Sequence, residues 1–164
     1  MQNARDTFYV TLRDRLAALN AARTMVLRGV SRPGVLVEEN ELATAYQAVD
    51  TFCLRWTGLQ VGPRAALPLV SMVCEIEYST DGSAGNGGMD RGRLLAGMDA
   101  ELVAAVSAAP QRVVKTDSAG SAVVTMGTNV FWSDATFAAV VADGERLKRV
   151  ATVEVFAYQE AGEL

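Results

Sequence analysis

The chain has 164 residues, of which 15 are Lys or Arg and 19 are Asp or Glu, giving a formal net charge of −4 and a sequence pI near 4.9. This charge gives no overall attraction to a nucleic-acid backbone, which excludes a sequence-reading DNA protein, and no polybasic segment predicts a membrane surface as partner. Because 50% of the residues are apolar, a fully disordered chain is also excluded, and the length predicts one domain over residues 1–164.

Histidine is absent from the sequence, which excludes a Ser-His-Asp triad, an imidazole general base and a His-bearing zinc site. Carboxylates, Lys, Tyr and Cys do not cluster at catalytic spacing along the chain. We therefore expect a protein that is not an enzyme and that needs no cofactor or metal. Charged side chains interrupt the first 25 residues, so the sequence predicts neither a signal peptide nor a spanning helix and places the chain in a cytoplasm.

The first predicted element is a helix from residue 4 to about residue 22. Asn3 and Asp6 are placed like an N-cap and its N3 partner at its start. Apolar side chains recur along this segment at the spacing of one helix face, which is expected to pack on the rest of the domain. These side chains are Phe8, Leu12, Leu16 and Leu19.

Two short apolar runs follow, at residues 25–27 and 35–37, and Gly29, Pro33 and Gly34 separate them. Such punctuation is typical of connections between strands, so this segment predicts either two strands or a strand and a loop.

Residues 38–50 fit either a short helix or a loop and are left unassigned. Alternation over residues 52–57 predicts a strand that ends before Gly58, and residues 62–68 are typical of a loop.

The clearest predicted strand spans residues 69–79. Because side chains alternate between the two faces of a strand, one face is expected to be core and the other largely solvent-exposed. The core face holds Val70, Met72, Cys74, Ile76 and Tyr78, and the other holds Ser71, Val73, Glu75, Glu77 and Ser79.

A Gly-rich loop at residues 81–90 follows, and then a helix that ends before Pro110. Asp90 is placed to cap this helix at its N-terminus. Apolar side chains recur at every fourth position and predict that the helix packs on the sheet. They are Leu94, Met98, Leu102 and Val106.

Residues 113–141 contain short β-prone pieces broken by Gly and Asn, and predict an extended region of strands and loops. Alternation over residues 149–158 predicts a closing strand. The order helix, strands, helix, strands predicts an α+β fold, in which a mixed, mainly antiparallel sheet packs with an N-terminal helix and a central amphipathic helix.

The Gly-rich loop contains Gly82, Gly85, Gly87 and Gly88, but its other residues do not fit the known ligand loops. A phosphate-binding P-loop needs a lysine that is missing, and Asp90 stands where the third glycine of a dinucleotide fingerprint belongs. A calcium loop lacks its closing glutamate. The favoured interpretation is a flexible loop that becomes ordered only when it binds a partner.

Two further groups of residues each allow a chemical and a structural interpretation. Glu75, Glu77 and Glu154 lie on strand faces and imitate a catalytic carboxylate group, although a solvated sheet face is favoured. Cys53 and Cys74 lie in strand-like runs, and without a histidine partner they are best interpreted as buried structural thiols rather than a nucleophile or a disulfide.

Phe131 and Trp132 lie in a polar stretch beside Asn129 and Asp134. They predict either an anchor for a partner or two core aromatics, and the sequence leaves both open.

Taken in order, four segments resemble the tail-terminator, or tail-completion, family of long-tailed bacteriophages of the lambda type. They are a helix in DTFYVTLRDRLAAL, a hairpin region with an acidic turn in RPGVLVEENE, a strand, loop and helix from MVCEIEYSTDG through DRGRLLAGMDAELVAAV, and a closing strand in RVATVEVFAYQE. The resemblance is one of pattern and order over most of the chain. The Gly-rich insert and the long 113–141 region depart from the smaller members.

The resemblance implies an α+β virion subunit, assembled in the host cytoplasm, that takes part in head-tail joining at the neck of the particle. It implies a ring, expected to be a hexamer, that caps the tail tube, stops its polymerisation and docks the head-side connector or stopper protein. Genomic DNA would pass through the lumen without being read. Ring closure uses heterologous interfaces, and the candidate interface residues are Asp81, Gly82, Asn86, Asp90, Arg91, Arg93, Phe131 and Trp132.

Two alternatives remain open at this point. The first keeps the virion setting and makes the chain another neck or head-completion ring protein. The second is a small ligand-binding domain or enzyme of the ferredoxin-like kind, which would need a concave pocket with convergent polar groups.

Overall fold

The computed structural model describes residues 1–41, 48–63, 67–161 and 163. Its helices are α1 (Gln2–Leu19), α2 (Glu38–Glu41) and α3 (Arg91–Val106), with a 3₁₀ turn η1 (Ala84–Asn86) before α3. Its strands are β1 (Thr24–Leu27), β2 (Val30–Pro33), β3 (Val35–Val37), β4 (Phe52–Val61), β5 (Leu69–Thr80), β6 (Arg112–Asp117), β7 (Val124–Trp132), β8 (Thr136–Phe137), β9 (Val141–Asp143) and β10 (Arg146–Tyr158).

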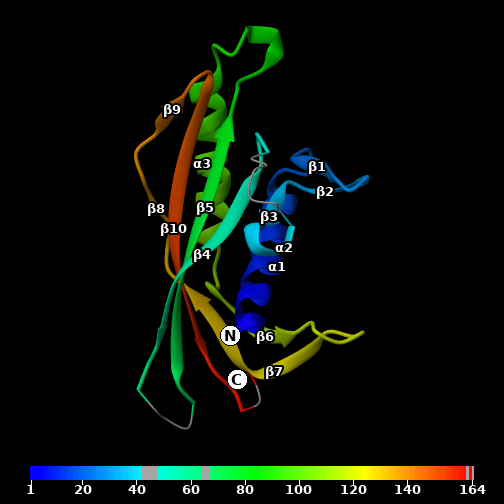
Figure 1. Ribbon diagram of the computed structural model, residues 1–164, viewed down its shortest axis with the longest axis vertical. Helices are drawn as coiled ribbons and strands as arrows, with labels where there is room; N and C mark the ends of the chain where they lie inside the picture. Colours follow the sequence, from blue (N-terminus) through cyan, green and yellow to red (C-terminus); the bar gives the residue numbers. More distant parts are fainter. Residues whose placement is uncertain (42–47, 64–66, 162, 164) are drawn as a thin grey trace.

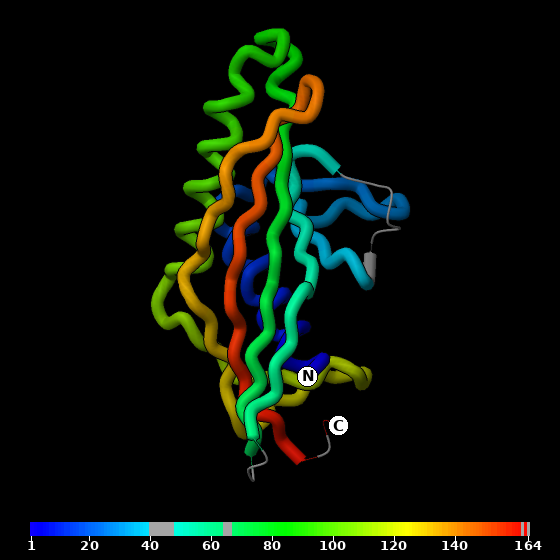
Figure 2. Tube along the Cα trace, turned by 60° about the vertical axis from the view of Figure 1, so that its left-hand side comes forward, coloured from blue at the N-terminus to red at the C-terminus, as the bar shows by residue number. Residues whose placement is uncertain are grey.

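Within the described residues, β3-β4-β5-β10-β7-β6 are neighbours in that order in one main sheet, and β8 and β9 also pair with β10 (Figures 1 and 2). The β3–β4 pair is parallel and the other pairs of the main sheet are antiparallel. β1 and β2 form a separate two-stranded sheet. The predicted α+β fold with a mixed, mainly antiparallel sheet is confirmed.

The centre of the sheet is the long pairing of β5 with β10, which runs from Leu69 opposite Tyr158 to Thr80 opposite Leu147. Both strands follow the alternation that the sequence predicts. The side chains expected on the core face of β5 are all buried, and so are four side chains on the same face of β10, because the two helices cover that face. These are Val70, Met72, Cys74, Ile76 and Tyr78 of β5 and Ala151, Val153, Val155 and Ala157 of β10.

α1 and α3 lie on the same face of the sheet, behind the strands in the view of Figure 2. The buried Phe8 of α1 lies 5.5 Å from the ring centroid of Trp132 and 6.0 Å from that of Trp56, in edge-to-face geometry. α3 contributes the buried side chains Leu95, Met98, Leu102, Ala105 and Val106. Both helices lie on the predicted segments, although α1 ends at Leu19, before the predicted residue 22. Most of the predicted apolar side chains are buried, but Leu19 and Leu94 are exposed, and Leu95 takes the buried position in the first turn of α3.

Two buried polar contacts tie α3 to the sheet and to the chain after α1. Tyr78 donates a 2.5 Å hydrogen bond to Asp99, which also accepts one of 2.7 Å from Arg149. Burial, followed by the neighbouring Asp99 carboxylate, raises the pKa of Tyr78, so this hydroxyl stays protonated and donates. Arg23 and Glu101 form a second ion pair at 2.7 Å.

α1 also closes one edge of the main sheet. β6 is the edge strand there, and the Thr116 amide donates a 3.0 Å hydrogen bond to Oγ1 of Thr7 on α1. An uncovered edge offers its free amide and carbonyl groups to other strands, and the helix prevents that pairing at this position.

The predicted capping pair of α1 was wrong. The helix begins at Gln2, the Asn3 side chain contacts the sulfur of Met126 at 3.5 Å, and the Asp6 carboxylate accepts a hydrogen bond from Gln2. Tertiary packing against β7 therefore decides the role of Asn3, and no local sequence pattern reports that contact.

The predicted end of β4 before Gly58 was also wrong, because the strand continues to Val61. The register shifts between Trp56 and Gly58, which marks a β-bulge. A Cβ at Gly58 would lie 2.9 Å from a methyl group of Val73, so the glycine makes room for a cross-strand side chain. Glycine here signals close packing rather than the end of a strand.

The segments that the sequence left open take definite forms. Residues 25–37 contain three short strands rather than two, and residues 38–41 form α2, whereas residues 42–47 lie outside the described residues. Part of the predicted loop at 62–68 also lies outside them. In the 113–141 region, β7 runs unbroken through Gly127, a residue that suggested a break.

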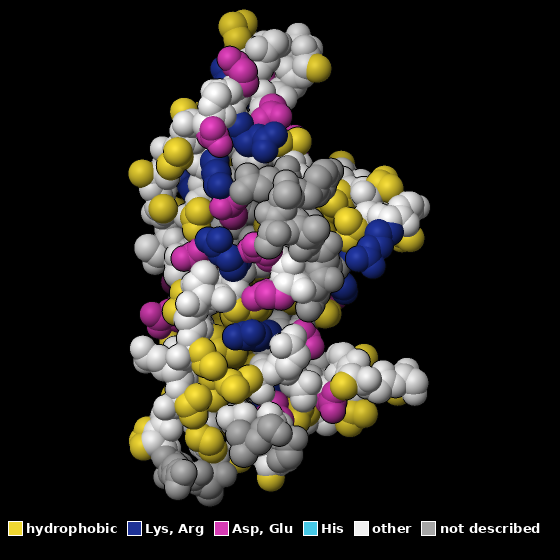
Figure 3. Space-filling model, in the orientation of Figure 1, with side chains coloured by type: hydrophobic (Ala, Val, Ile, Leu, Met, Phe, Trp, Pro, Cys, Tyr) yellow, Lys and Arg dark blue, Asp and Glu magenta, His cyan; other side chains and the backbone are white. Residues whose placement is uncertain are grey.

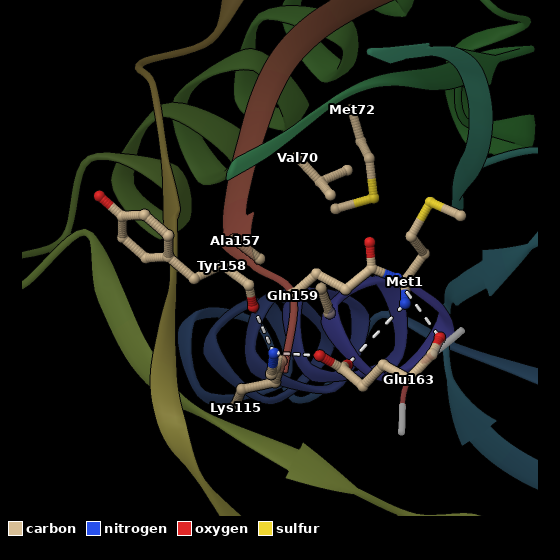
Figure 4. A pocket seen from close by; sticks show the side chains of 9 residues that line it. Met1, Val70, Met72, Lys115, Ala157, Tyr158, Gln159 and Glu163 are labelled. Atoms are coloured by element: carbon tan, nitrogen blue, oxygen red, sulfur yellow. Dashed lines mark hydrogen bonds and ion pairs between the residues drawn. The ribbon is translucent and has the colours of Figure 1, made fainter. Parts of the chain in front are cut away.

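A buried lysine holds the end of the described chain against the sheet (Figure 4). Lys115 of β6 is fully buried, and its Nζ lies 2.6 Å from a carboxylate oxygen of Glu163 and 2.5 Å from the carbonyl oxygen of Tyr158. Glu160 lies at 3.5 Å from the same ammonium group and accepts hydrogen bonds from Thr128. Since a buried charge is stable only when it is paired and hydrogen-bonded, these contacts fix Glu160 and Glu163 against β6 and β7.

Replacing Lys115 with Met is expected to destabilise the fold by about 3 kcal/mol, because it removes the closer of the two cations at the buried Glu163 carboxylate and leaves only the terminal ammonium group of Met1, at 3.8 Å. Denaturation by urea measures this loss. The double variant Lys115→Met/Glu163→Met should recover a large part of it.

The matched control is Lys148→Met, which removes the partially exposed ion pair of Lys148 with Glu77. Its expected cost is below about 1 kcal/mol. Equal costs for the two lysine variants would contradict the assigned role of Lys115.

Candidate assembly surfaces

The Gly-rich loop joins β5 to α3 and projects from one end of the molecule, at the top of Figure 1. The sequence predicted a flexible excursion, but within the described structure the loop forms the 3₁₀ turn η1 and is closed by its own side chains. The Asp90 carboxylate accepts hydrogen bonds from the amide and hydroxyl of Ser83 at 2.8 and 2.6 Å and from the Asn86 side chain at 3.0 Å.

These bonds change the role of Asp90. It stands at the N-cap position of α3, as predicted, but its side chain makes no capping hydrogen bond to the helix. The bonds from Ser83, followed by the bond from Asn86, lower the pKa of Asp90 to about 2. The carboxylate therefore closes the loop and stays ionised at neutral pH.

Glycine is required at the base of the loop. Gly82 has φ +83°, and a Cβ there would lie 2.6 Å from Cα of Gly88. The two ends of the loop can approach so closely only because neither residue carries a side chain.

Two ion pairs join this base to the turn between β9 and β10. Asp81 accepts a 2.8 Å hydrogen bond from Arg146, which lowers the pKa of Asp81, and Arg91 contacts Glu145 at 2.8 Å. Of the predicted interface residues in this loop, Asp81, Asn86, Asp90 and Arg91 therefore already have partners in their own chain. Arg93 is exposed on α3.

The most exposed apolar side chain of the loop is Met89, at 89%. Met89 was not among the predicted interface residues, although a methionine directly after Gly87 and Gly88 was a visible signal of an apolar group in a solvent-exposed loop. With Arg93 it forms the part of this end that is free to meet another molecule.

Phe131 and Trp132 point to opposite faces of the sheet and have different surroundings. Trp132 is 6% exposed, packs on Phe8, and donates a 2.9 Å hydrogen bond to the Val106 carbonyl, so it is a core aromatic. Phe131 is half-buried on the opposite face of β7, directly across from Phe156.

The face of the sheet that is turned away from α1 and α3, here called the open face, is apolar toward one end. Figure 3 shows apolar side chains gathered over the lower part of the molecule. Alternation and register place five apolar side chains on the open face of β5, β7 and β10, namely Leu69, Val73, Phe131, Phe156 and Tyr158.

The carboxylates of the open face do not form a catalytic group. Glu75 pairs with Arg55 at 2.8 Å and Glu77 with Lys148 at 2.9 Å, while Glu154 is exposed. All three lie on a partly solvated sheet face, as the favoured interpretation predicted, and two of them are engaged in ion pairs.

The thiols are also poorly suited to chemistry. Cys74 is buried and Cys53 is half-buried, and both are free. Burial raises the pKa of Cys74, and burial followed by the charge of Glu38 raises that of Cys53 to about 12. Neither forms a thiolate at neutral pH. Among the described residues, no group of three or more His, Cys, Asp and Glu side chains is placed to hold a metal ion.

Apolar side chains are exposed at three further projecting ends of the fold (Figures 1 and 3). These are the tips of the β1–β2, β4–β5 and β6–β7 hairpins. The side chains, all more than 45% exposed, are Val26, Val30, Leu59, Val61, Leu67, Val123 and Val124. Where exposed apolar side chains gather at one projecting end, they offer a surface for contacts with other molecules.

Neither the models of known protein families nor the curated protein sequences contain a match to this chain. Among the described residues, no helix combines the length and the apolar character needed to cross a bilayer.

Replacing Asp90 with Ala is expected to open the Gly-rich loop without unfolding the domain. In the parent chain the pKa of Asp90 is lowered to about 2. Its carboxylate should therefore stay ionised, and keep its bonds to Ser83, as the pH falls below the ordinary Asp pKa of about 3.9, and should lose them only as the pH falls through about 2. The Ser83 amide resonance, followed by NMR over pH, measures this. A titration midpoint near 4 would contradict the closure by Asp90.

Proposed function

We propose that the chain is a structural subunit of a bacteriophage virion, a tail terminator that assembles into a ring at the end of the tail tube. The ordered resemblance of its sequence to that family suggests the setting. The observation that carries the proposal is the set of projecting apolar ends, because they are costly for a free monomer and become favourable when neighbouring subunits cover them.

The positions of the ionisable side chains support a structural role rather than an enzymatic one. The ionisable groups with perturbed pKa values are explained by burial or by ion pairs that hold the fold, such as Tyr78 with Asp99 and Asp81 with Arg146. They do not converge on an enclosed site, whereas a ligand-binding domain or enzyme would bring several polar groups together in a concave pocket.

In the proposed ring, contacts are heterologous, with different surfaces of each subunit meeting side by side. The exposed end of the Gly-rich loop, with Met89 and Arg93, extends along the long axis of the molecule (Figure 1). We assign it to the contact with the tail-tube protein or the head-side connector. Genomic DNA would pass through the lumen, where an acidic chain avoids sticking to it.

Light scattering of the purified protein across concentration tests the proposal. The expected result is a particle with the mass of about six subunits, formed either alone or on addition of tail tubes, and a halt to tube elongation. A monomer that neither associates nor affects tube growth at any concentration would contradict it. Rings that bind a head connector but not tubes would instead identify another neck protein.

The double variant Met89→Ser/Arg93→Glu is expected to retain the melting temperature of the parent, because neither side chain is buried. It should form rings normally but bind tubes or connectors at least about tenfold more weakly, since the exposed end loses its apolar and cationic contacts. Binding is measured by co-sedimentation. Leu19→Ser, at an exposed site on α1, is the control and should bind as the parent does.

A further inference from the structure

The β1–β2 hairpin is tied to its own chain at its base, where Arg32 donates a 2.8 Å hydrogen bond to the Tyr9 hydroxyl of α1, but its tip projects away from the main sheet. It forms a two-stranded sheet of its own, with four residue pairs from Thr24 opposite Pro33 to Leu27 opposite Val30. An isolated two-stranded hairpin is at best marginally stable in water. It projects sideways from the molecule, to the right in Figure 1. Contact with a second surface would stabilise it.

The tip of this hairpin is apolar and cationic. Arg28 and Gly29 form the turn with φ values of +51° and +81°. Val26 and Val30, on opposite faces of the hairpin, are 67% and 64% exposed. Arg28 is exposed and forms no hydrogen bond or ion pair with the described residues. The tip therefore fits a recess that offers apolar walls on two sides and a negative charge.

The opposite side of the molecule has such a recess. The segment from β8 to β9 runs beside β10, at the left in Figures 1 and 2, and its pairing with β10 shifts by one residue between the two strands. An open groove of about 510 Å³ lies there. Its apolar lining is formed by Ala138, Ala139, Val141, Ala142 and Val150.

The charges at the groove are paired except for one. Lys148 pairs with Glu77 and Arg149 with Asp99, whereas Asp143 is exposed and, among the described residues, is not in a hydrogen bond or ion pair. Asp143 lies opposite Arg146 in the β9–β10 pairing, and the guanidinium group of Arg146 is bound to Asp81 at 2.8 Å. Asp143 thus gives the groove one exposed carboxylate that forms no ion pair with the described residues, and Arg28 at the hairpin tip has the complementary charge.

We propose that the β1–β2 hairpin tip of one subunit inserts into the β8–β9 groove of the next copy of the same chain, with Arg28 paired to Asp143. The hairpin and the groove lie on opposite sides of the subunit, so the contact is heterologous and repeats around a closed ring. The inference rests on the self-association in the proposed function and specifies which surfaces form the ring contact.

Two charge reversals test this contact. Arg28→Asp and Asp143→Arg each create like charges across the interface and are expected to weaken self-association by about a hundredfold. Asp is well suited to the turn before Gly29, because Asp-Gly is a favoured pair in such hairpins, so Arg28→Asp should not disturb the hairpin itself.

A mixture of the two variants in equal amounts should assemble again. Each hairpin then meets a groove of opposite charge on its neighbour, and the subunits alternate around the ring. The double variant Arg28→Asp/Asp143→Arg should also assemble by itself. Arg112→Asp, which changes an exposed arginine on β6, is the control and should assemble like the parent.

The outcomes separate the two proposals. If the parent forms rings and both single variants do so equally well, or if the mixture fails to restore assembly, this contact is wrong while the proposed ring stands. If the parent itself remains a monomer even on tail tubes, both the contact and the proposed function are overturned. Analytical ultracentrifugation of the single variants and of their mixture gives the answer.

Discussion

The pairing of β5 with β10 is the constraint on which the rest of the fold depends. These strands pair over twelve consecutive residue pairs, and the face that they share is apolar from Ala151 to Ala157 and from Val70 to Tyr78, so that face must be covered. α1 and α3 cover it, and β4, β7, β8 and β9 extend the sheet on either side. The covered face holds the core, while the open face and the projecting hairpins remain available for contacts between molecules.

The regular elements could be predicted from sequence because their periods are strong. The alternation along β5 and β10 and the four-residue spacing along α3 each indicate an element with one buried face and one exposed face. Short or irregular elements could not be predicted as well. Gly58 and Gly127 were interpreted as breaks, yet both lie within strands, because a cross-strand side chain or a neighbouring segment decides their environment.

The candidate site was only partly accessible from sequence, for a physical reason. A sequence shows which residues occupy a loop, but it does not show that Asp90 turns back to Ser83 or that Arg146 binds Asp81 across 65 residues. Those contacts leave Met89 and Arg93 exposed. Similarly, the order Phe131-Trp132 gives no sign that the strand points one ring into the core and the other outward.

The central claim is that the chain caps tail tubes, and electron microscopy of tubes mixed with gold-labelled protein tests it most directly. If the chain is a tail terminator, label is expected at one end of each tube, with no label along the walls, and the tubes should no longer elongate from the labelled end. Label distributed along the walls, or tubes that bind none and continue to grow, would contradict it.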